Sequence, residues 1–196
     1  MIPGRTYDRV DSSTPPGLRL LQEFLNTLDE REFERFGERH RHEDLLGSPR
    51  DLADWLAART VHPPGRPGPQ EHERAIRLRA AIREVLAHRA GLPADLDGAR
   101  SELSRYALAI AVTEDGELRL ESREAGVGRV LGDLVASVAR AAADGSLDRM
   151  RMCGSDECRW VFYDGSRSGR GRWCSMEPCG NRVKTRAYRR RRHAAA

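Results

Sequence analysis

The four cysteines of the chain, Cys153, Cys158, Cys174 and Cys179, all fall within 27 residues near its C-terminal end. They form two C-x4-C pairs separated by fifteen residues. Each pair can supply two thiolates from one turn, and an insert of hairpin length can fold back and bring the two pairs together around a tetrahedral ion. The spacing therefore predicts one structural Zn2+ with all four cysteines as its ligands.

The cellular compartment bears on this prediction because disulfides persist mainly under oxidising conditions. The first ten residues, MIPGRTYDRV, lack the apolar core of a secretory signal peptide. No apolar run approaches the length that spans a membrane. We therefore expect a cytoplasmic protein with no membrane association, in which clustered thiols stay reduced and bind metal. Disulfides or unrelated thiols are the alternative.

Charge is distributed unevenly along the 196 residues. Residues 1–150 contain 22 arginines against 26 aspartates and glutamates, a net charge of −4. Residues 151–196 contain twelve basic against four acidic residues, a net charge of +8. An acidic body joined to a basic segment predicts that this segment binds a polyanion while the body serves another role.

Apolar residues recur at helical spacing in several segments of the body. Ser48 followed by Pro49 is typical of a helix start, and Gly91 of a helix end. Residues 106–122 contain two apolar or alternating runs around the turn sequence EDG and predict a β-hairpin. The expected helices cover approximately residues 15–30, a short stretch from residue 49 onward, 70–89, 96–106 and 127–145.

The cysteine segment has its own expected order of elements. Between the two pairs, Trp160–Tyr163 has strand character and is followed by an Asp-Gly turn. We expect a first cysteine turn, a hairpin, a second cysteine turn and a helix that Ser175 caps and that holds Cys179 at its N-terminal end. The predicted fold class is α+β, mostly α-helical. It comprises a helical domain over 1–147 with one small hairpin, and a four-cysteine module over 148–196 whose hairpin is followed by a basic helix.

Two parts of the chain resemble known families. The sequence RWCSM at 172–176, the sequence CGNR at 179–182 and the basic run that follows resemble the CGNR zinc finger. The sequence FLNT at 24–27 and DLADWL at 51–56 resemble the ABATE domain of stress-induced transcription regulators, which such fingers typically follow. The resemblance covers nearly the whole chain. The chain has Glu23 where the family usually has aspartate.

The resemblance implies zinc binding, DNA binding and transcription regulation in a stress response, with a body that senses an unknown small-molecule effector. It points to Glu23, Asn26 and Thr27 as ligand-binding residues, while a structural hydrogen-bond network is the other role open to Asn26 and Thr27. No Ser-His-Asp arrangement, nucleotide-binding loop or pair of catalytic carboxylates stands out. We therefore expect no enzyme, and a homodimer is left open.

The basic segment predicts a nucleic-acid-binding surface. If residues from about 176 to 192 form a helix, four of its arginines share one face by i, i+4, i+7 and i+8 spacing. Arginine binds phosphate or guanine, and asparagine can pair with adenine or support the zinc site. A module that binds protein or RNA is the alternative to DNA binding. The candidate contact residues are Arg170, Arg172, Asn181, Arg182, Lys184, Arg186, Arg189 and Arg190.

Overall fold

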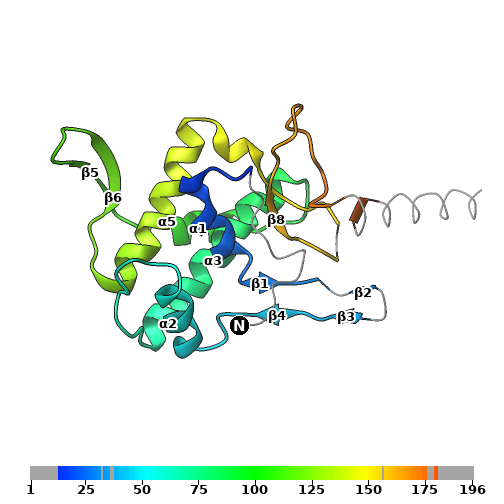
Figure 1. The fold of residues 1–196 in the computed structure, drawn as a ribbon, viewed down its shortest axis with the longest axis horizontal. Coiled ribbons are helices and arrows are strands. Elements are labelled where there is room, and N and C mark those ends of the chain that lie inside the picture. Colours follow the sequence, from blue (N-terminus) through cyan, green and yellow to red (C-terminus); the bar gives the residue numbers. More distant parts are fainter. Residues whose placement is uncertain (1–12, 32, 36–37, 156, 176–178, 181–196) are drawn as a thin grey trace, which may run out of the picture.

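The structure is a computed structural model that describes residues 13–31, 33–35, 38–155, 157–175 and 179–180. Helices dominate, and four two-stranded antiparallel sheets lie around them (Figure 1). This confirms the predicted α+β, mostly helical class. Within the described residues, no helix is both long and apolar enough to cross a membrane.

The helices lie close to their predicted positions. Ser48 accepts a hydrogen bond from the backbone N–H of Asp51 at 3.2 Å and caps α2. Gly91 ends α3 with φ of +74°, a backbone conformation that favours glycine. The helices are α1 (Pro16–Leu25), α2 (Pro49–Ala57), α3 (Pro69–Arg89), α4 (Leu96–Leu103), α5 (Gly126–Ala143) and the 3-10 helix η1 (Ser146–Arg149).

One of the four sheets matches the predicted hairpin in the body. It pairs Leu108–Val112 with Leu118–Ser122, in a register that places Val112 opposite Leu118. The remaining three sheets were not predicted as such. The strands are β1 (Leu28–Asp29), β2 (Phe33–Arg35), β3 (Glu38–His40), β4 (Glu43–Asp44), β5 (Leu108–Val112), β6 (Leu118–Ser122), β7 (Met150–Met152) and β8 (Val161–Tyr163).

The predicted extent of the first helix is wrong. The helix was expected to continue to Glu30, but α1 ends at Leu25 and Asn26 is its C-cap. The Asn26 side chain is held by hydrogen bonds to Val161, so it directs the chain out of the helix. The described strands between residues 28 and 44 then form a narrow ladder, called the 28–44 ladder, in which β1 pairs with β4 and β2 pairs with β3 (Figure 1).

The order of elements in the cysteine segment also differs from the prediction. The hairpin does not follow the first cysteine turn but encloses it, because β7 lies before Cys153 and β8 lies after Cys158. The register pairs Met152 with Val161. The hairpin therefore fixes the two ends of the first cysteine pair. The basic helix expected over about 176–192 lies outside the described residues except for Cys179 and Gly180.

The larger of two hydrophobic clusters joins the helical body to the cysteine segment and is called the common core. Helix α3 packs against α1, α2, α4, α5 and β7. Four side chains from the end of the body and from the β7–β8 hairpin belong to the same buried cluster as Phe24 and Leu86 of the helices. These four are Leu147, Met150, Met152 and Val161. The division into domains at 147/148 remains a prediction, and any such domains share this core.

Asn26 forms the closest polar link between α1 and β8. Its Nδ2 donates to the carbonyl of Val161 at 2.7 Å, and its Oδ1 accepts from the Val161 N–H at 2.9 Å. The adjacent Gln22 also donates to the Val161 carbonyl, at 3.3 Å. Both Val161 and Asn26 are buried. One asparagine side chain thus satisfies both backbone groups of a strand residue that water does not reach.

We expect Asn26→Ala to lower the free energy of unfolding by about 2–4 kcal/mol, because it leaves a buried N–H and weakens the pairing of a buried carbonyl. Denaturant titration would measure this loss. Gln70→Ala removes an exposed amide from the first turn of α3 and should change stability by less than about 0.5 kcal/mol. Equal unfolding midpoints for wild type and Asn26→Ala would contradict this role.

Candidate metal centre

The four cysteine sulfur atoms form one compact cluster. All four Sγ atoms lie within 4.8 Å of one another. Two of the distances are 3.6 Å, between Cys158 and Cys174, and 3.7 Å, between Cys174 and Cys179. A tetrahedral zinc ion with Zn–S bonds of about 2.3 Å requires S···S distances of roughly 3.8 Å. The residues therefore fit a zinc ion, and the predicted structural Zn2+ site is confirmed.

The sulfur positions do not fit disulfides. A disulfide requires an S–S bond of about 2.05 Å, and the four thiols are free. Cys153, Cys158 and Cys179 are buried, whereas Cys174 is partly exposed. Four thiolates fill a tetrahedral coordination shell and leave no open position for a substrate or water. The geometry is therefore that of a structural metal site.

The first cysteine turn is shaped by local hydrogen bonds. The Cys153 N–H donates to the carbonyl of Trp160 and continues the β7–β8 ladder at 2.9 Å. The Cys158 N–H donates to the Ser155 carbonyl, also at 2.9 Å. Arg159 follows with φ of +49°, a left-handed conformation in which the chain reverses direction. These contacts direct Cys153 and Cys158 toward the same point.

Asp164 organises the loop that delivers the second cysteine pair. Its carboxylate accepts from the N–H groups of Ser166 at 3.1 Å and Gly171 at 2.6 Å. Burial opposes ionisation of this carboxyl group, but these hydrogen bonds and the charge of Arg151 hold its pKa below the ordinary value. The Gly154 N–H then donates to the Arg172 carbonyl at 2.9 Å, which attaches the returning segment to the first cysteine turn.

The close approach of four thiols changes their acidity in opposite directions. Hydrogen bonds from Cys158, then from Cys174 and Cys179, lower the pKa of the Cys153 thiol. Interaction with Cys153 raises the pKa of Cys158 and of Cys174. Thiolates are the form that binds metal, so loading the site must release protons.

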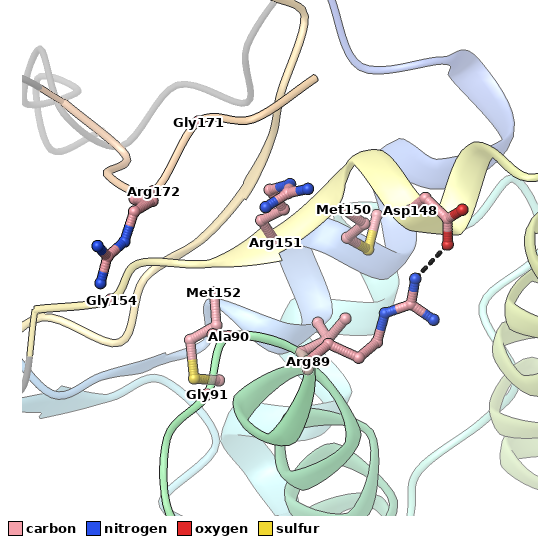
Figure 2. Close-up of a pocket in the computed structure, with 11 residues that line it drawn as sticks. Arg89, Ala90, Gly91, Asp148, Met150, Arg151, Met152, Gly154, Gly171 and Arg172 are labelled. Carbon is pink, nitrogen blue, oxygen red and sulfur yellow. Dashed lines mark hydrogen bonds and ion pairs between the residues drawn. The ribbon is translucent and has the colours of Figure 1, made fainter. Parts of the chain in front are cut away.

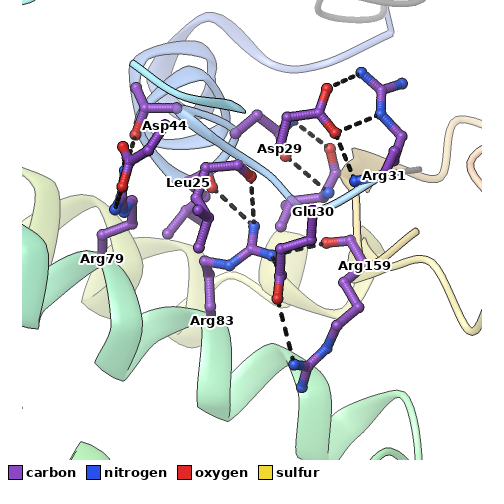
Figure 3. Close-up of polar contacts among 12 residues, drawn as sticks. Leu25, Asp29, Glu30, Arg31, Asp44, Arg79, Arg83 and Arg159 are labelled. Carbon is purple, nitrogen blue, oxygen red and sulfur yellow. Dashed lines mark hydrogen bonds and ion pairs between the residues drawn. The ribbon is translucent and has the colours of Figure 1, made fainter. Parts of the chain in front are cut away.

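An arginine–carboxylate network holds the metal centre against the body (Figure 3). The buried Arg83 guanidinium donates to the Leu25 carbonyl at 2.9 Å and to the Arg159 carbonyl at 3.3 Å. It also forms an ion pair with Glu30. Arg159 approaches the same Glu30 carboxylate at 3.6 Å. A single guanidinium therefore connects the end of α1, the segment after β1 and the first cysteine turn.

Two further arginines extend this network. Arg31 lies over the Trp160 ring, with its Cζ 3.9 Å from the ring centroid, and binds Asp29 through Nε at 2.8 Å. Arg79 binds the Asp44 carboxylate at 2.7 and 2.6 Å. Burial opposes ionisation of Asp44, yet the hydrogen bond from Arg79 holds the pKa of this carboxyl below its ordinary value. The ladder of residues 28–44 is thus fixed to α3 and to the cysteine segment.

The sequence interpretation did not identify this network. The sequence of α3 does indicate such a network, because Arg79 and Arg83 are four residues apart among the apolar positions that face the core. A long helix that places two arginines on its buried side must supply them with acceptors. The sequence did not reveal which acceptors these would be.

The three residues predicted to bind a ligand have different partners in the structure, and their ligand-binding role stays a prediction. Glu23 accepts a hydrogen bond from Arg59, two residues after the end of α2, at 2.7 Å. Asn26 binds the backbone of Val161. The Thr27 hydroxyl donates to the Phe24 carbonyl at 2.7 Å and accepts from Arg79 at 2.9 Å. Asn26 and Thr27 therefore belong to a structural hydrogen-bond network.

Two of the predicted nucleic-acid contacts lie within the described residues. Arg170 and Arg172 are both exposed. The Arg172 Cζ lies 5.2 Å from the centroid of the Trp173 ring, next to the metal ligand Cys174. The other six predicted contacts lie outside the described residues: Asn181, Arg182, Lys184, Arg186, Arg189 and Arg190.

Purified full chain should contain one zinc ion per molecule by metal analysis, and Cys179→Ser should lose it. Because β7 and β8 belong to the common core, chelation should lower the thermal stability of the whole chain in one transition. Structural zinc sites are worth on the order of 10 kcal/mol. Ser168→Ala, an exposed change between the two pairs, should retain the metal. A protein without zinc whose four thiols are readily alkylated would contradict the site.

Comparison with known families agrees with this geometry. Residues 149–192 match the model of the CGNR zinc finger. Residues 18–146 match the model of ABATE, described as "Putative stress-induced transcription regulator". A search of curated proteins gives no match. Since the ABATE model matches more than half of the chain, the protein belongs to the ABATE family and carries a CGNR zinc finger whose four clustered cysteines accommodate one structural zinc.

Proposed function

We propose that the protein is a cytoplasmic, zinc-dependent, DNA-binding transcription regulator whose N-terminal domain senses a small-molecule effector. The observation that carries this proposal is the position of the four-thiol site, directly before the most basic part of the chain. Residues 181–196 contain seven arginines and lysines and no acidic residue. A metal-stabilised fold that ends in such a segment is suited to binding nucleic acid.

The charge distribution supports DNA as the polyanion. Contacts between basic side chains and backbone phosphates supply most of the affinity for duplex DNA. Arginine and asparagine can also read base edges in the major groove. The anchoring of the finger to an acidic body restricts the directions from which DNA can approach, because the net negative body repels phosphate. DNA is therefore expected to bind on the side of the finger that faces away from the body.

Binding of a protein partner is a second candidate function, and one surface favours it. The β5–β6 hairpin projects from the body (Figure 1). Ile110, Val112 and Leu118 lie on one face of it and are 73, 69 and 72% exposed. Exposed apolar residues gathered on one face are typical of protein interaction sites. This surface lies outside the finger, so it can coexist with DNA binding.

Replacement of Arg182, Arg186, Arg189 and Arg190 together by alanine should weaken duplex binding at every salt concentration. The slope of log affinity against log salt should shrink by up to about one unit for each lost phosphate contact. Fluorescence anisotropy with a labelled duplex would measure both effects. Zinc content should be unchanged, because the four cysteines are retained.

A matched control removes the same number of charges from the body. Arg50, Arg100, Arg105 and Arg119 are all strongly exposed, with side chains 89, 77, 64 and 62% accessible. Their combined replacement by alanine should leave the salt slope intact. Equal losses of affinity in the two quadruple variants would indicate a general charge effect. Unchanged affinity in the first variant would overturn the DNA-binding role of these arginines and favour the protein-binding alternative.

A further inference from the structure

A cavity of about 650 Å³ lies where the helical body meets the finger (Figure 2). It is bounded by the end of α3, by strand β7 and by the segment Gly171–Arg172 that leads to the second cysteine pair. This volume is within the range of small-molecule binding sites. None of Glu23, Asn26 and Thr27 lines it.

The floor of the cavity is apolar. Leu86, Met150 and Met152 line it, and all three belong to the common core. Methionine side chains are flexible and polarizable, so they adapt to ligands of different shapes. Leu86, Met150 and Met152 are 1, 1 and 2% exposed, so they close the base of the cavity and offer a ligand a small apolar contact.

Three arginines from three different segments also line the cavity. They are Arg89 at the end of α3, Arg151 on β7 and Arg172 beside the second cysteine pair (Figure 2). The lining contains one acidic residue, Asp148, and it is paired with Arg89. The lining therefore holds three arginines against one carboxylate, while Arg151 also forms an ion pair at 4.0 Å with Asp164, which lies outside the lining.

Arg151 has unused hydrogen-bonding capacity. Its Nε is buried and has no hydrogen-bond partner among the described residues. The nearest carboxylate oxygen belongs to Asp164 and lies 4.0 Å away, while that carboxylate accepts from the N–H groups of Ser166 and Gly171. A buried donor without a partner is costly. The Nε itself is closed to a ligand, but the Arg151 side chain is 34% exposed, so its accessible part can meet an anion in the cavity.

We propose that this cavity binds a small organic anion, with a carboxylate or phosphate group between Arg151 and Arg172 and an apolar part against Leu86, Met150 and Met152. Guanidinium groups bind such anions through paired, charge-assisted hydrogen bonds. The combination of a cationic wall and an apolar floor selects against neutral and cationic molecules. The ligand is thus distinguished by its chemistry and not only by its size.

The position of the cavity links the ligand to the finger. Arg151 is on β7, between the core residues Met150 and Met152, whereas Arg172 lies two residues before the metal ligand Cys174. An anion between these arginines would hold the segment before the second cysteine pair against the body. This regulatory consequence rests on the proposed DNA-binding function. The binding of the anion itself does not.

The test uses phenyl phosphate as the probe, with zinc-loaded full chain and isothermal titration calorimetry. We expect one saturable site per chain and no saturable binding of phenol, which has the ring but not the anion. The double variant Arg151→Gln, Arg172→Gln should bind phenyl phosphate at least tenfold more weakly. Arg100→Gln, Arg119→Gln, a pair of exposed changes outside the cavity lining, should bind it like wild type. Unchanged zinc content and circular dichroism would show that both variants are folded.

Several results would overturn the proposal. No saturable binding of phenyl phosphate to wild type, or equal binding by the two double variants, would remove the site. Equal binding of phenol would remove the requirement for an anion. Displacement of phenyl phosphate by a DNA duplex would identify a backbone phosphate as the occupant and overturn the effector assignment. Failure of the proposed function would be seen separately, as absence of duplex binding by wild type in anisotropy experiments without the probe.

Discussion

The burial of the Arg83 guanidinium is the constraint on which the arrangement of the finger depends. A buried charge is tolerated only when its donors meet acceptors and its charge meets an opposite charge. Arg83 finds them in three segments that are distant in sequence: the Leu25 carbonyl, the Glu30 carboxylate and the Arg159 carbonyl. The end of α1, the start of the 28–44 ladder and the first cysteine turn must therefore come together around one side chain.

Asn26 adds a second polar link between the body and the finger. Both links bind backbone groups of the β7–β8 hairpin. Arg83 contacts the carbonyl of Arg159, and Asn26 binds both backbone groups of Val161. Since Met152 and Val161 also belong to the common core, the finger is attached to the body by burial as well as by hydrogen bonds. Metal binding and folding of the helices are therefore expected to be coupled, although the family models divide the chain between residues 146 and 149.

This coupling has a functional meaning for a regulator. A finger on a flexible tether could bind DNA without regard to the state of the body. Here the first cysteine pair is fixed to α1 and α3, while the second pair is reached through the loop held by Asp164 and the segment that borders the arginine-lined cavity. A ligand in that cavity would contact β7, which leads to the first cysteine pair, and the segment Gly171–Arg172, which leads to the second pair. The fold thus provides a short physical path between this cavity and the segment proposed to bind DNA.

Local sequence signals determined a large part of this protein. The C-x4-C spacing defined the four clustered thiols, Ser48 and Gly91 marked the ends of two helices, and the EDG turn marked the β5–β6 hairpin. Each of these signals depends on residues within one or two turns of chain, so it can be read without the fold. What only the tertiary structure decided are the partners of buried polar groups. Asn26 ends α1 because it binds a residue 135 positions away, and Arg79 and Arg83 are stable inside because the ladder and the cysteine turn supply their acceptors. Such pairings depend on which distant segments pack together, and no local pattern encodes them.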